Sequence, residues 1–232
     1  MTDFPKSATA RFTLYGASIS PFVRKIRVLL AEKAIPYELV PVNIFAPPPW
    51  FATISPLKRI PVLHDAEAPG TGVLADSSVI AAYLEKLFPT PALYPAAAWD
   101  YAQALWLEEY CDTDLIACAG REVFRPRVVS RFLGQSCDEQ LVHKGMTQSL
   151  PPFFAYLEAR IAGRSHFVGD TLTLADIAVA APFVNLKHAG ERPDPATYPA
   201  LTDFLGRMFA RSSFAALIAE ETAFLARVGK AA

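Results

Sequence analysis

Ser20 and Pro21 stand where the chain can turn sharply from a strand into a helix. The residues before them, 12–16, alternate and favour a strand, and apolar residues recur at helical spacing after Pro21. Serine is a preferred N-cap, and proline a preferred first helical residue. The start of such a helix carries unpaired N–H groups and the positive end of the helix dipole. This junction can therefore stabilise an anion, and a thiolate is an anion.

Two further junctions could hold the rest of a small ligand. Ile60-Pro61 opens a predicted strand, and a cis peptide bond, essentially confined to X–Pro, is one way to fit proline there. The N–H and C=O of Ile60 would then point out of the sheet, free to pair with an extended peptide. Asp76-Ser77 opens another predicted helix, where hydroxyl and N–H groups can hold a carboxylate. Arg59 offers a cation for a second carboxylate.

Several other chemistries lack their residues in this sequence. No G-x-S-x-G elbow surrounds a serine, and the four histidines show no partner spacing, which argues against a hydrolase. There is neither a glycine-rich phosphate loop nor a cluster of metal ligands, so we expect no metal. Each chosen residue also has a structural alternative: Ser20 as a plain helix cap, Arg59 as a surface cation, and Asp76-Ser77 as an ordinary helix start.

A small α/β domain is expected to position these residues. The predicted order is strand, helix, strand, loop, hairpin and helix, a βαβ unit followed by ββα. The second strand is expected at 37–42, and the loop at 43–55 contains at most a short helix. This domain is predicted over residues 10–88, followed by a proline- and alanine-rich linker over 89–98.

The rest of the chain, residues 99–230, is predicted to be an all-helical domain. Apolar and aromatic residues recur at helical spacing from 99 to 125, where Pro126 should stop or kink the helix. A second long helix over 138–160 should be bent or interrupted at Pro151-Pro152.

A third helix of this domain carries its own start signal. Thr173 and Asp176 have the spacing of a capping box, in which each residue satisfies a backbone N–H near the other. Two more helices are expected at 198–208 and 213–228. The fold class is therefore α/β followed by all-α.

The composition excludes several classes of protein. The chain of 232 residues has a formal net charge of −1 and no basic tract, which argues against nucleic-acid binding. Its apolar runs are interrupted well short of the ~18 residues that a membrane span needs, so no membrane segment is expected. Three cysteines with no C-x-x-C pair fit a reducing compartment, and we expect a cytoplasmic protein.

Taken in order, the motifs resemble those of a known family. Tyr-Gly-x-x-x-Ser-Pro-Phe from Tyr15, Arg-Ile-Pro-Val-Leu from Arg59 and Asp-Ser-x-x-Ile-x-x-Tyr-Leu from Asp76 resemble the thioredoxin-like domain of the cytosolic glutathione transferases. The helical half, with Thr-Leu-Ala-Asp from Thr173, is similar to that family's all-α domain. The resemblance extends over residues 11–228 and points to serine-type members, such as those that are tau-, zeta- or theta-like.

The resemblance implies a role for each residue in the N-terminal half. Ser20 matches the residue that stabilises the glutathione thiolate, as a hydrogen-bond donor and not as a nucleophile. Ile60, before a cis Pro61, matches the residue whose backbone pairs with the cysteinyl part of glutathione. Asp76-Ser77 matches the pair that holds the γ-glutamyl end, although Glu or Gln is more usual than Asp at the first position. Arg59 stands where relatives often carry a lysine near the glycyl carboxylate.

The proposed role of Ser20 agrees with thiol chemistry. An unperturbed thiol has a pKa of about 8.5, so little thiolate exists at pH 7. A hydroxyl hydrogen bond and a helix dipole both favour the anion. A fall in pKa of about two units, roughly 2.7 kcal/mol, would make most of the bound thiol nucleophilic. Ser18, two residues earlier, and Tyr15 are rival donors.

The resemblance also implies the reaction and the partners. Glutathione would be the co-substrate, its thiolate would attack a small hydrophobic electrophile, and the protein would be a homodimer. The electrophile site is expected between the two domains, in the proline-rich loop and the first long helix. The candidates there, by position, are Phe45, Trp50, Tyr110, Asp114 and Arg121.

Three alternatives to a transferase could use the same scaffold. A glutathione-dependent isomerase, similar to the maleylacetoacetate isomerases, would differ only in the electrophile pocket. A binding or regulatory protein could keep the fold without catalysis, although it would have no need to keep Ser20, Ile60 and Ser77 together. A thiol–disulfide reductase is disfavoured because Ser20 stands where that chemistry needs a cysteine.

Overall fold

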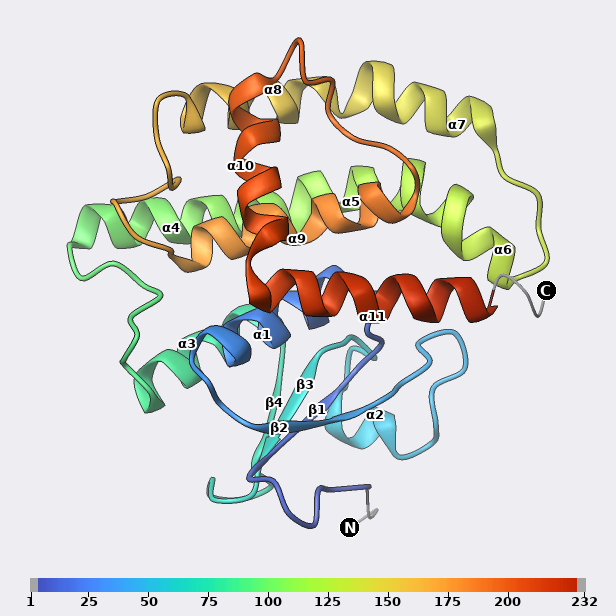
Figure 1. Cartoon of the computed structure of the whole chain (residues 1–232). Coiled ribbons are helices and arrows are strands. Elements are labelled where there is room, and N and C mark those ends of the chain that lie inside the picture. Colours follow the sequence, from blue (N-terminus) through green and yellow to red (C-terminus); the bar gives the residue numbers. More distant parts are fainter. Residues whose placement is uncertain (1–3, 229–232) are drawn as a thin grey trace. The chain divides into compact units, whose positions relative to one another are not determined.

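The structure, a computed structural model, describes residues 4–228 and divides between Leu93 and Tyr94 into two compact units (Figure 1). The first unit contains a four-stranded sheet with helices, and the second contains helices alone. The predicted fold class, an α/β domain with thioredoxin-like order followed by an all-α domain, is therefore confirmed.

The sheet of the first unit has the strand order β2-β1-β3-β4. β1 runs parallel to β2 and antiparallel to β3, and β3 and β4 form the predicted hairpin. The strands are β1 (Phe12–Tyr15), β2 (Tyr37–Val40), β3 (Val62–Asp65) and β4 (Val73–Ala75).

Three helices complete the first unit. They are α1 (Pro21–Glu32), which links β1 to β2, α2 (Phe51–Ile54), the short helix allowed for in the loop, and α3 (Ser77–Leu87). The apolar repeat that predicted α1 is fully buried, since Val23, Ile26 and Leu30 are each 0% exposed. α1 and α3 pack against each other (Figure 1). The two central strands, β1 and β3, are buried along their whole length, so the core of this unit lies around them.

The second unit opens with one long helical run that continues past Pro126. Of the two outcomes predicted at Pro126, a stop or a kink, the stop does not occur, because the proline lies inside a π-helical segment, Gly120–Val129. Wider π turns commonly occur where the i→i−4 ladder is interrupted, as a proline interrupts it. The run comprises α4 (Ala98–Tyr110), the π-helical segment Cys111–Leu115, α5 (Ile116–Ala119), Gly120–Val129 and α6 (Ser130–Phe132).

The second predicted long helix is interrupted near the proline pair, as expected. α7 (Glu139–Lys144) continues into a π-helical segment, Gly145–Ser149, and α8 (Pro151–Ile161) then begins with Pro151 in its first turn. Proline suits this place because its missing N–H would be unpaired there in any case.

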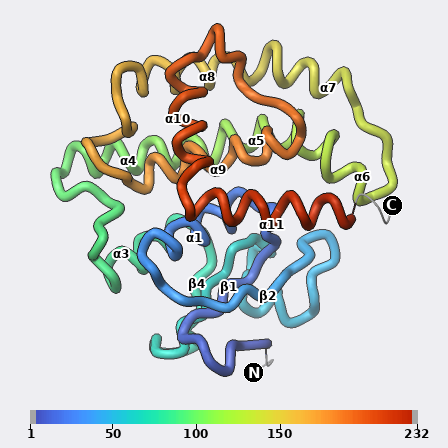
Figure 2. The backbone as a smooth tube through the Cα atoms, viewed as in Figure 1, coloured from blue at the N-terminus to red at the C-terminus, as the bar shows by residue number. Residues whose placement is uncertain are grey.

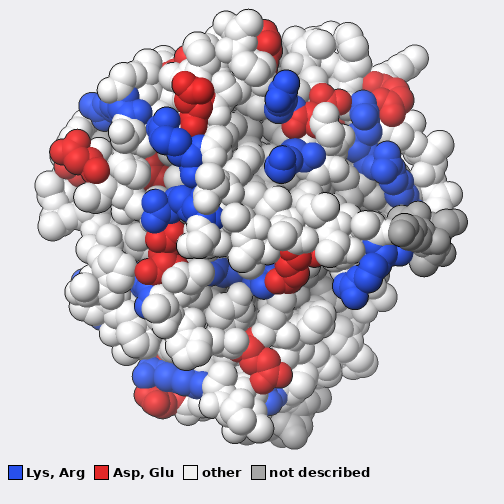
Figure 3. All heavy atoms as spheres, in the orientation of Figure 1, with Lys and Arg blue, Asp and Glu red and all other residues white. Residues whose placement is uncertain are grey.

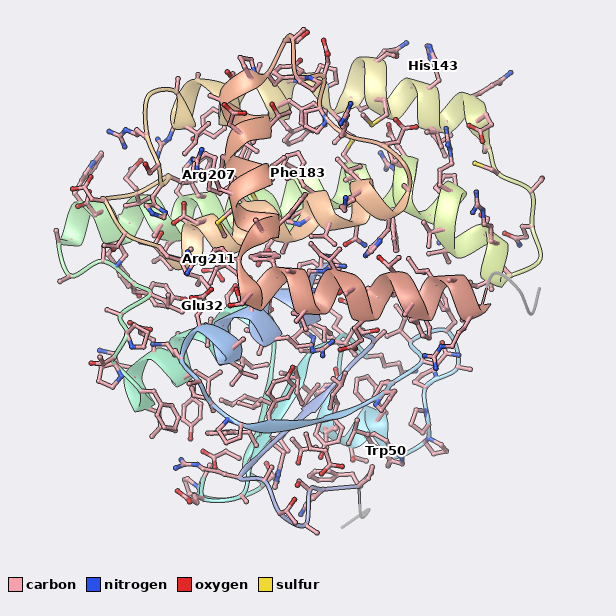
Figure 4. All side chains as sticks on the ribbon, viewed as in Figure 1. Glu32, Trp50, His143, Phe183, Arg207 and Arg211 are labelled. Carbon is pink, nitrogen blue, oxygen red and sulfur yellow. The ribbon has the colours of Figure 1, made fainter. Side chains whose placement is uncertain are left out.

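α9 (Leu174–His188) is the central helix of the second unit, as Figure 2 shows. Every residue from Leu174 to Leu186 is buried, and α9 packs against α4, α5 and α10 (Pro199–Ala210). Phe183 on α9, labelled in Figure 4, lies 5.6 Å from the ring of Phe154. α11 (Ser212–Val228) is the last helix and packs against α10.

Asp176 anchors the start of α9. Its Oδ2 accepts the Thr173 N–H at 2.8 Å and the Thr173 hydroxyl at 3.2 Å, which supports the predicted capping box. Its Oδ1 accepts the Phe167 N–H at 2.8 Å. The carboxylate is 0% exposed, and these bonds offset the cost of burying it.

Between residues 4 and 228, no helix combines the length and the apolar character needed to cross a bilayer.

On the face shown in Figure 3, positive and negative side chains of the helical unit are interspersed, so no large area of one sign forms there.

Candidate functional site

Ser20 is the N-cap of α1, as the sequence predicts. Its backbone is extended (φ −73°, ψ 129°), and Pro21 occupies the first helical turn. The Ser20 Oγ accepts the Val23 N–H at 3.5 Å, a long and therefore weak hydrogen bond. Because the hydroxyl acts here as an acceptor, its own proton remains available to donate to an anion.

Gly16 follows β1 directly and hydrogen-bonds through its backbone to the end of β2 and to a residue just beyond it. Its N–H donates to the Val40 carbonyl oxygen at 3.1 Å, and its own carbonyl accepts the Val42 N–H at 3.3 Å. A β-carbon on Gly16 would lie 2.4 Å from Cγ2 of Val23 and 3.4 Å from Cβ of Ile60. Gly16 therefore lets the first turn of α1 and Ile60 approach the same point. No role for Gly16 was predicted from the sequence, where it stands out only as a glycine directly after a predicted strand.

The Ile60–Pro61 peptide bond is cis, in agreement with the sequence prediction. The Pro61 carbonyl oxygen accepts the N–H of Asp76 at 3.4 Å. The turn before β3 is thus tied directly to the start of α3.

Ser55 fixes the backbone on the other side of this turn. Its hydroxyl donates to the Arg59 carbonyl oxygen at 2.8 Å and accepts the Arg59 N–H at 2.9 Å. Ser55 is buried, whereas Arg59 is exposed, so the backbone of Arg59 is fixed while its side chain faces solvent. Ser55 was missed by sequence reasoning, because a serine in a loop gives no signal of a contact four residues away.

Asp76 is the N-cap of α3. Its Oδ1 accepts the N–H groups of Ser78 and Val79 at 2.9 and 3.2 Å, and its backbone has φ +99° and ψ 131°. Among the described residues, the other carboxylate oxygen has no partner. Ser77, beside it, is buried at 5% exposure. One oxygen of Asp76 thus caps the helix, and the second makes no hydrogen bond with a described residue.

The strand register explains why these junctions are neighbours. Tyr15 pairs with Val62, and Val62 pairs with Ala75, so Gly16, Pro61 and Asp76 follow at the same end of the sheet. The starts of α1 and α3 are both at this end. Two helix N-termini at one end of a sheet favour anionic groups, such as a thiolate and a carboxylate.

Tyr15 is already engaged elsewhere, unlike Ser20. Its side chain is 0% exposed, and its hydroxyl donates to the Pro5 carbonyl oxygen at 2.5 Å. Burial raises the pKa of Tyr15 to about 12. The ring lies edge-on to Phe4 at 6.0 Å and to Trp50 at 5.7 Å, measured between ring centres. The rival donor Ser18 is half-buried in the turn before Ser20, and its hydroxyl has no partner among the described residues.

The predicted electrophile residues of the first unit differ in exposure. Phe45 is 58% exposed, in the loop that precedes α2. Trp50 is half-buried and contacts Phe51 as well as Tyr15, so it belongs in part to the packing of the unit.

The remaining predicted electrophile residues lie along one helical run of the second unit. Burial raises the pKa of Tyr110 to about 12, and its ring lies 4.7 Å from that of Tyr156. Asp114 is exposed one turn later. Arg121 is exposed and pairs with Glu122 at 3.0 Å. In the part of the chain that the structure describes, no three His, Cys, Asp or Glu side chains could together hold a metal ion.

The chain matches two models of a known protein family. A model of the glutathione S-transferase N-terminal domain matches residues 14–92, and a model of the glutathione S-transferase C-terminal domain matches residues 128–221. Both matches lie where the resemblance of the motifs indicated.

Individual relatives agree with these matches. The uncharacterised GST-like protein YibF of Escherichia coli is 31% identical over 206 residues, 87% of this chain and 96% of that protein. A crystal structure of a glutathione S-transferase from Methylobacterium radiotolerans, in complex with glutathione sulfonate, is 30% identical with a TM-score of 0.71. The similarity covers 90% of this chain and 94% of that one.

One further relative is similar over a shorter stretch. Pyrimidodiazepine synthase of Drosophila melanogaster is 33% identical over 95 residues, which is 41% of this chain and 38% of that protein.

Proposed function

The chain belongs to the glutathione S-transferase family, and from that premise we propose a serine-type transferase that activates glutathione through Ser20. The observation that supports the proposal is the strand register, which puts the β1–α1 junction with Ser20, the turn with Ile60 before β3 and the start of α3 with Asp76 at one end of the sheet. A donor hydroxyl, a backbone pairing site and a carboxylate-binding helix start match the cysteinyl thiol, the cysteinyl backbone and the γ-glutamyl end of one tripeptide.

Ser20 acts as a donor in this proposal. The thiol of glutathione loses its proton to solvent, and the Ser20 hydroxyl donates a hydrogen bond to the resulting thiolate. The N-terminus of α1 adds the field of its dipole, and both effects lower the thiol pKa. The thiolate then attacks the electrophile: a carbon–sulfur bond forms, and the leaving group departs with its electron pair.

The other residues hold the peptide. The N–H and C=O of Ile60 pair with the cysteinyl backbone, and Pro61 turns them away from the sheet. The second carboxylate oxygen of Asp76 accepts a hydrogen bond from the γ-glutamyl ammonium. Ser77 and the N–H groups at the start of α3 bind the γ-glutamyl carboxylate. Arg59, exposed beside this turn, attracts the glycyl carboxylate. The residues proposed to contact the electrophile remain Phe45, Trp50, Tyr110, Asp114 and Arg121.

We also propose that the protein is a homodimer. Support comes from large apolar side chains that lie exposed on two helices, Val79 (49%) and Leu87 (37%) on α3, and Tyr101 (41%) and Leu105 (38%) on α4. Exposed apolar residues that cluster on a helix commonly mark an interface. Sedimentation equilibrium should give twice the chain mass, and a monomer at micromolar concentration would contradict this part of the proposal. The three free cysteines fit the proposed cytoplasmic location.

The function is tested in two steps. The protein should be retained on immobilised glutathione and eluted by free glutathione; failure to bind would remove the proposal. It is then incubated with glutathione and chloronitrobenzene, a hydroperoxide or a cis-enone. Conjugation of chloronitrobenzene supports a transferase, and turnover of the cis-enone alone indicates an isomerase. Binding without any turnover indicates a non-catalytic relative.

A further inference from the structure

The helical unit contains a cavity of about 460 Å³ that none of the roles above uses. The start of α4, the end of α8 and the segment Phe167–Gly169 line it, and it is open to solvent on one side. This volume lies in the range of small-molecule sites. The lining side chains with polar or aromatic groups are Trp99, Asp100, Gln103, Arg160 and Arg164.

Arg160 is held in place at the wall of the cavity. Its Nη1 donates to Oε1 of Gln103 at 3.0 Å, and its guanidinium lies 6.0 Å from the centre of the Tyr156 ring. A guanidinium has five N–H donors, and only one of them is used by a described residue. Arg160 therefore presents to the cavity a positively charged group of fixed orientation, with N–H donors that no described residue uses.

Arg164 adds a second cation to the same cavity. It is exposed, and it makes no ion pair with any residue from 4 to 228. Asp100 also lines the cavity, but neither arginine lies within ion-pair distance of it. Two arginines against one carboxylate leave one net positive charge, which suits a singly charged anion better than a dianion.

The start of α4 strengthens this preference. Its N-cap, Ala97, has no side-chain oxygen, so no side chain caps the first N–H groups of this 13-residue helix. Uncapped N–H groups and the positive end of the helix dipole favour an anion at this place.

Trp99 supplies a surface for an apolar group. Trp99 lines the same cavity as the two arginines and is 74% exposed. An exposed indole face offers stacking to an aromatic ring. The buried Phe167 and Val168 complete an apolar wall of the cavity.

We propose that this cavity is a second ligand site, which binds a small aromatic monocarboxylate. The carboxylate pairs with Arg160 and Arg164, and the ring lies on Trp99. Every residue of the site belongs to the helical unit, whereas the residues assigned to glutathione belong to the first unit. The site therefore stands independently of the proposed transferase activity.

The test is calorimetric titration of the full chain with naphthalene-2-carboxylate. Arg164→Ala should weaken binding about tenfold, because a charge-assisted hydrogen bond is lost. Trp99→Ala should weaken it as well. Both side chains are exposed, so the variants should fold, which circular dichroism checks. Arg125→Ala, an exposed arginine of the same unit outside the cavity, is the matched control and should leave the affinity unchanged.

Two comparisons complete the design. The neutral analogue naphthalene-2-methanol should bind at least tenfold more weakly than the carboxylate, and Ser20→Ala should not change the affinity for the carboxylate. The proposal is overturned if the carboxylate does not bind the unmodified protein. It is equally overturned if Arg164→Ala and Trp99→Ala bind it as tightly as Arg125→Ala does.

Discussion

Gly16 lies so close to Val23 that a β-carbon on the glycine would stand 2.4 Å from Cγ2 of the valine. This close approach brings the residue that follows β1 against Val23, in the first turn of α1 and three residues beyond Ser20. The same β-carbon would lie 3.4 Å from Cβ of Ile60. A residue with no side chain thus sets the spacing between the helix start and the cis-proline turn.

Gly16→Ala should therefore lower the free energy of unfolding by about 1–3 kcal/mol, the usual cost of overpacking a core. Val23 is 0% exposed and cannot move into solvent. Urea unfolding measures the change. The double variant Gly16→Ala/Val23→Ala should be less destabilised than the sum of the two single variants, because it removes the clash.

Gly206 provides the matched control, since it lies inside α10 with nothing within 4 Å of its added β-carbon. Gly206→Ala should raise stability by about 0.5–1 kcal/mol. Equal effects of alanine at positions 16 and 206 would contradict the packing argument.

Tyr15→Phe should leave the thiol pKa of bound glutathione unchanged. The Tyr15 hydroxyl donates to the Pro5 carbonyl oxygen, and burial raises its pKa to about 12. The variant should lose only this hydrogen bond, about 1 kcal/mol of stability. Absorbance of the thiolate against pH measures the first quantity and urea unfolding the second. A rise of one unit in the thiol pKa would make Tyr15 the thiol donor.

Substitutions at Asp76 should separate its cap from its strained backbone. Asp76→Ala loses two capping hydrogen bonds and keeps a β-carbon at φ +99°, so it should cost about 1–2 kcal/mol. Asp76→Gly relieves the backbone strain, and it should be more stable than the alanine variant by about 1 kcal/mol. Thermal unfolding of the two variants gives the difference. Equal stability would mean that the backbone is unstrained.

Arg11 should stabilise the protein through the buried Asp65. The guanidinium binds both carboxylate oxygens at 2.9 Å, and the Asp65 side chain is 1% exposed. Burial alone would raise the pKa of Asp65, but hydrogen bonds from Arg11, Tyr83 and the Glu67 N–H outweigh it and lower this pKa. Arg11→Gln should lower the free energy of unfolding by about 2–3 kcal/mol at pH 7, because it leaves the buried Asp65 carboxylate without its positively charged partner.

The pH dependence of this pair has a definite sign. A carboxyl whose pKa is lower in the folded state stabilises the protein above its unfolded pKa, and this stability disappears as the pH falls through the folded pKa. The difference between the unmodified protein and Arg11→Gln should therefore shrink below the unfolded value of 3.8. Glu67→Gln removes the exposed partner of Arg11 and should cost less than about 1 kcal/mol. A gap that stays constant from pH 7 to pH 3 would contradict this account.

Much of the candidate site was predictable because its signals are local. Ser20-Pro21, Ile60-Pro61 and Asp76-Ser77 each mark a junction between elements, and the helix caps and the cis bond are found there. What the sequence could not supply is the strand register, which places Gly16, Pro61 and Asp76 at one end of the sheet.

Contacts between residues far apart in the sequence, and helix geometry, escaped prediction. Alternation placed Tyr15 in a strand, but nothing local indicated that Pro5 would accept its hydroxyl. Pro126 carries a strong stop signal, and no local signal in the sequence predicts the π-helical segment in which it lies. The cavity lined by Arg160 and Arg164 is likewise formed by distant segments, the start of α4 and the end of α8, in which Gln103 and Arg160 are 57 residues apart.

The most direct test of the central claim is the thiol pKa of glutathione bound to three proteins, measured by thiolate absorbance against pH. The unmodified protein should hold it about two units below 8.5, and Ser20→Ala should return it most of the way. Ser18→Ala, two residues away, is the matched control and should leave it low. If Ser18→Ala raises the thiol pKa while Ser20→Ala does not, the assignment of Ser20 is contradicted.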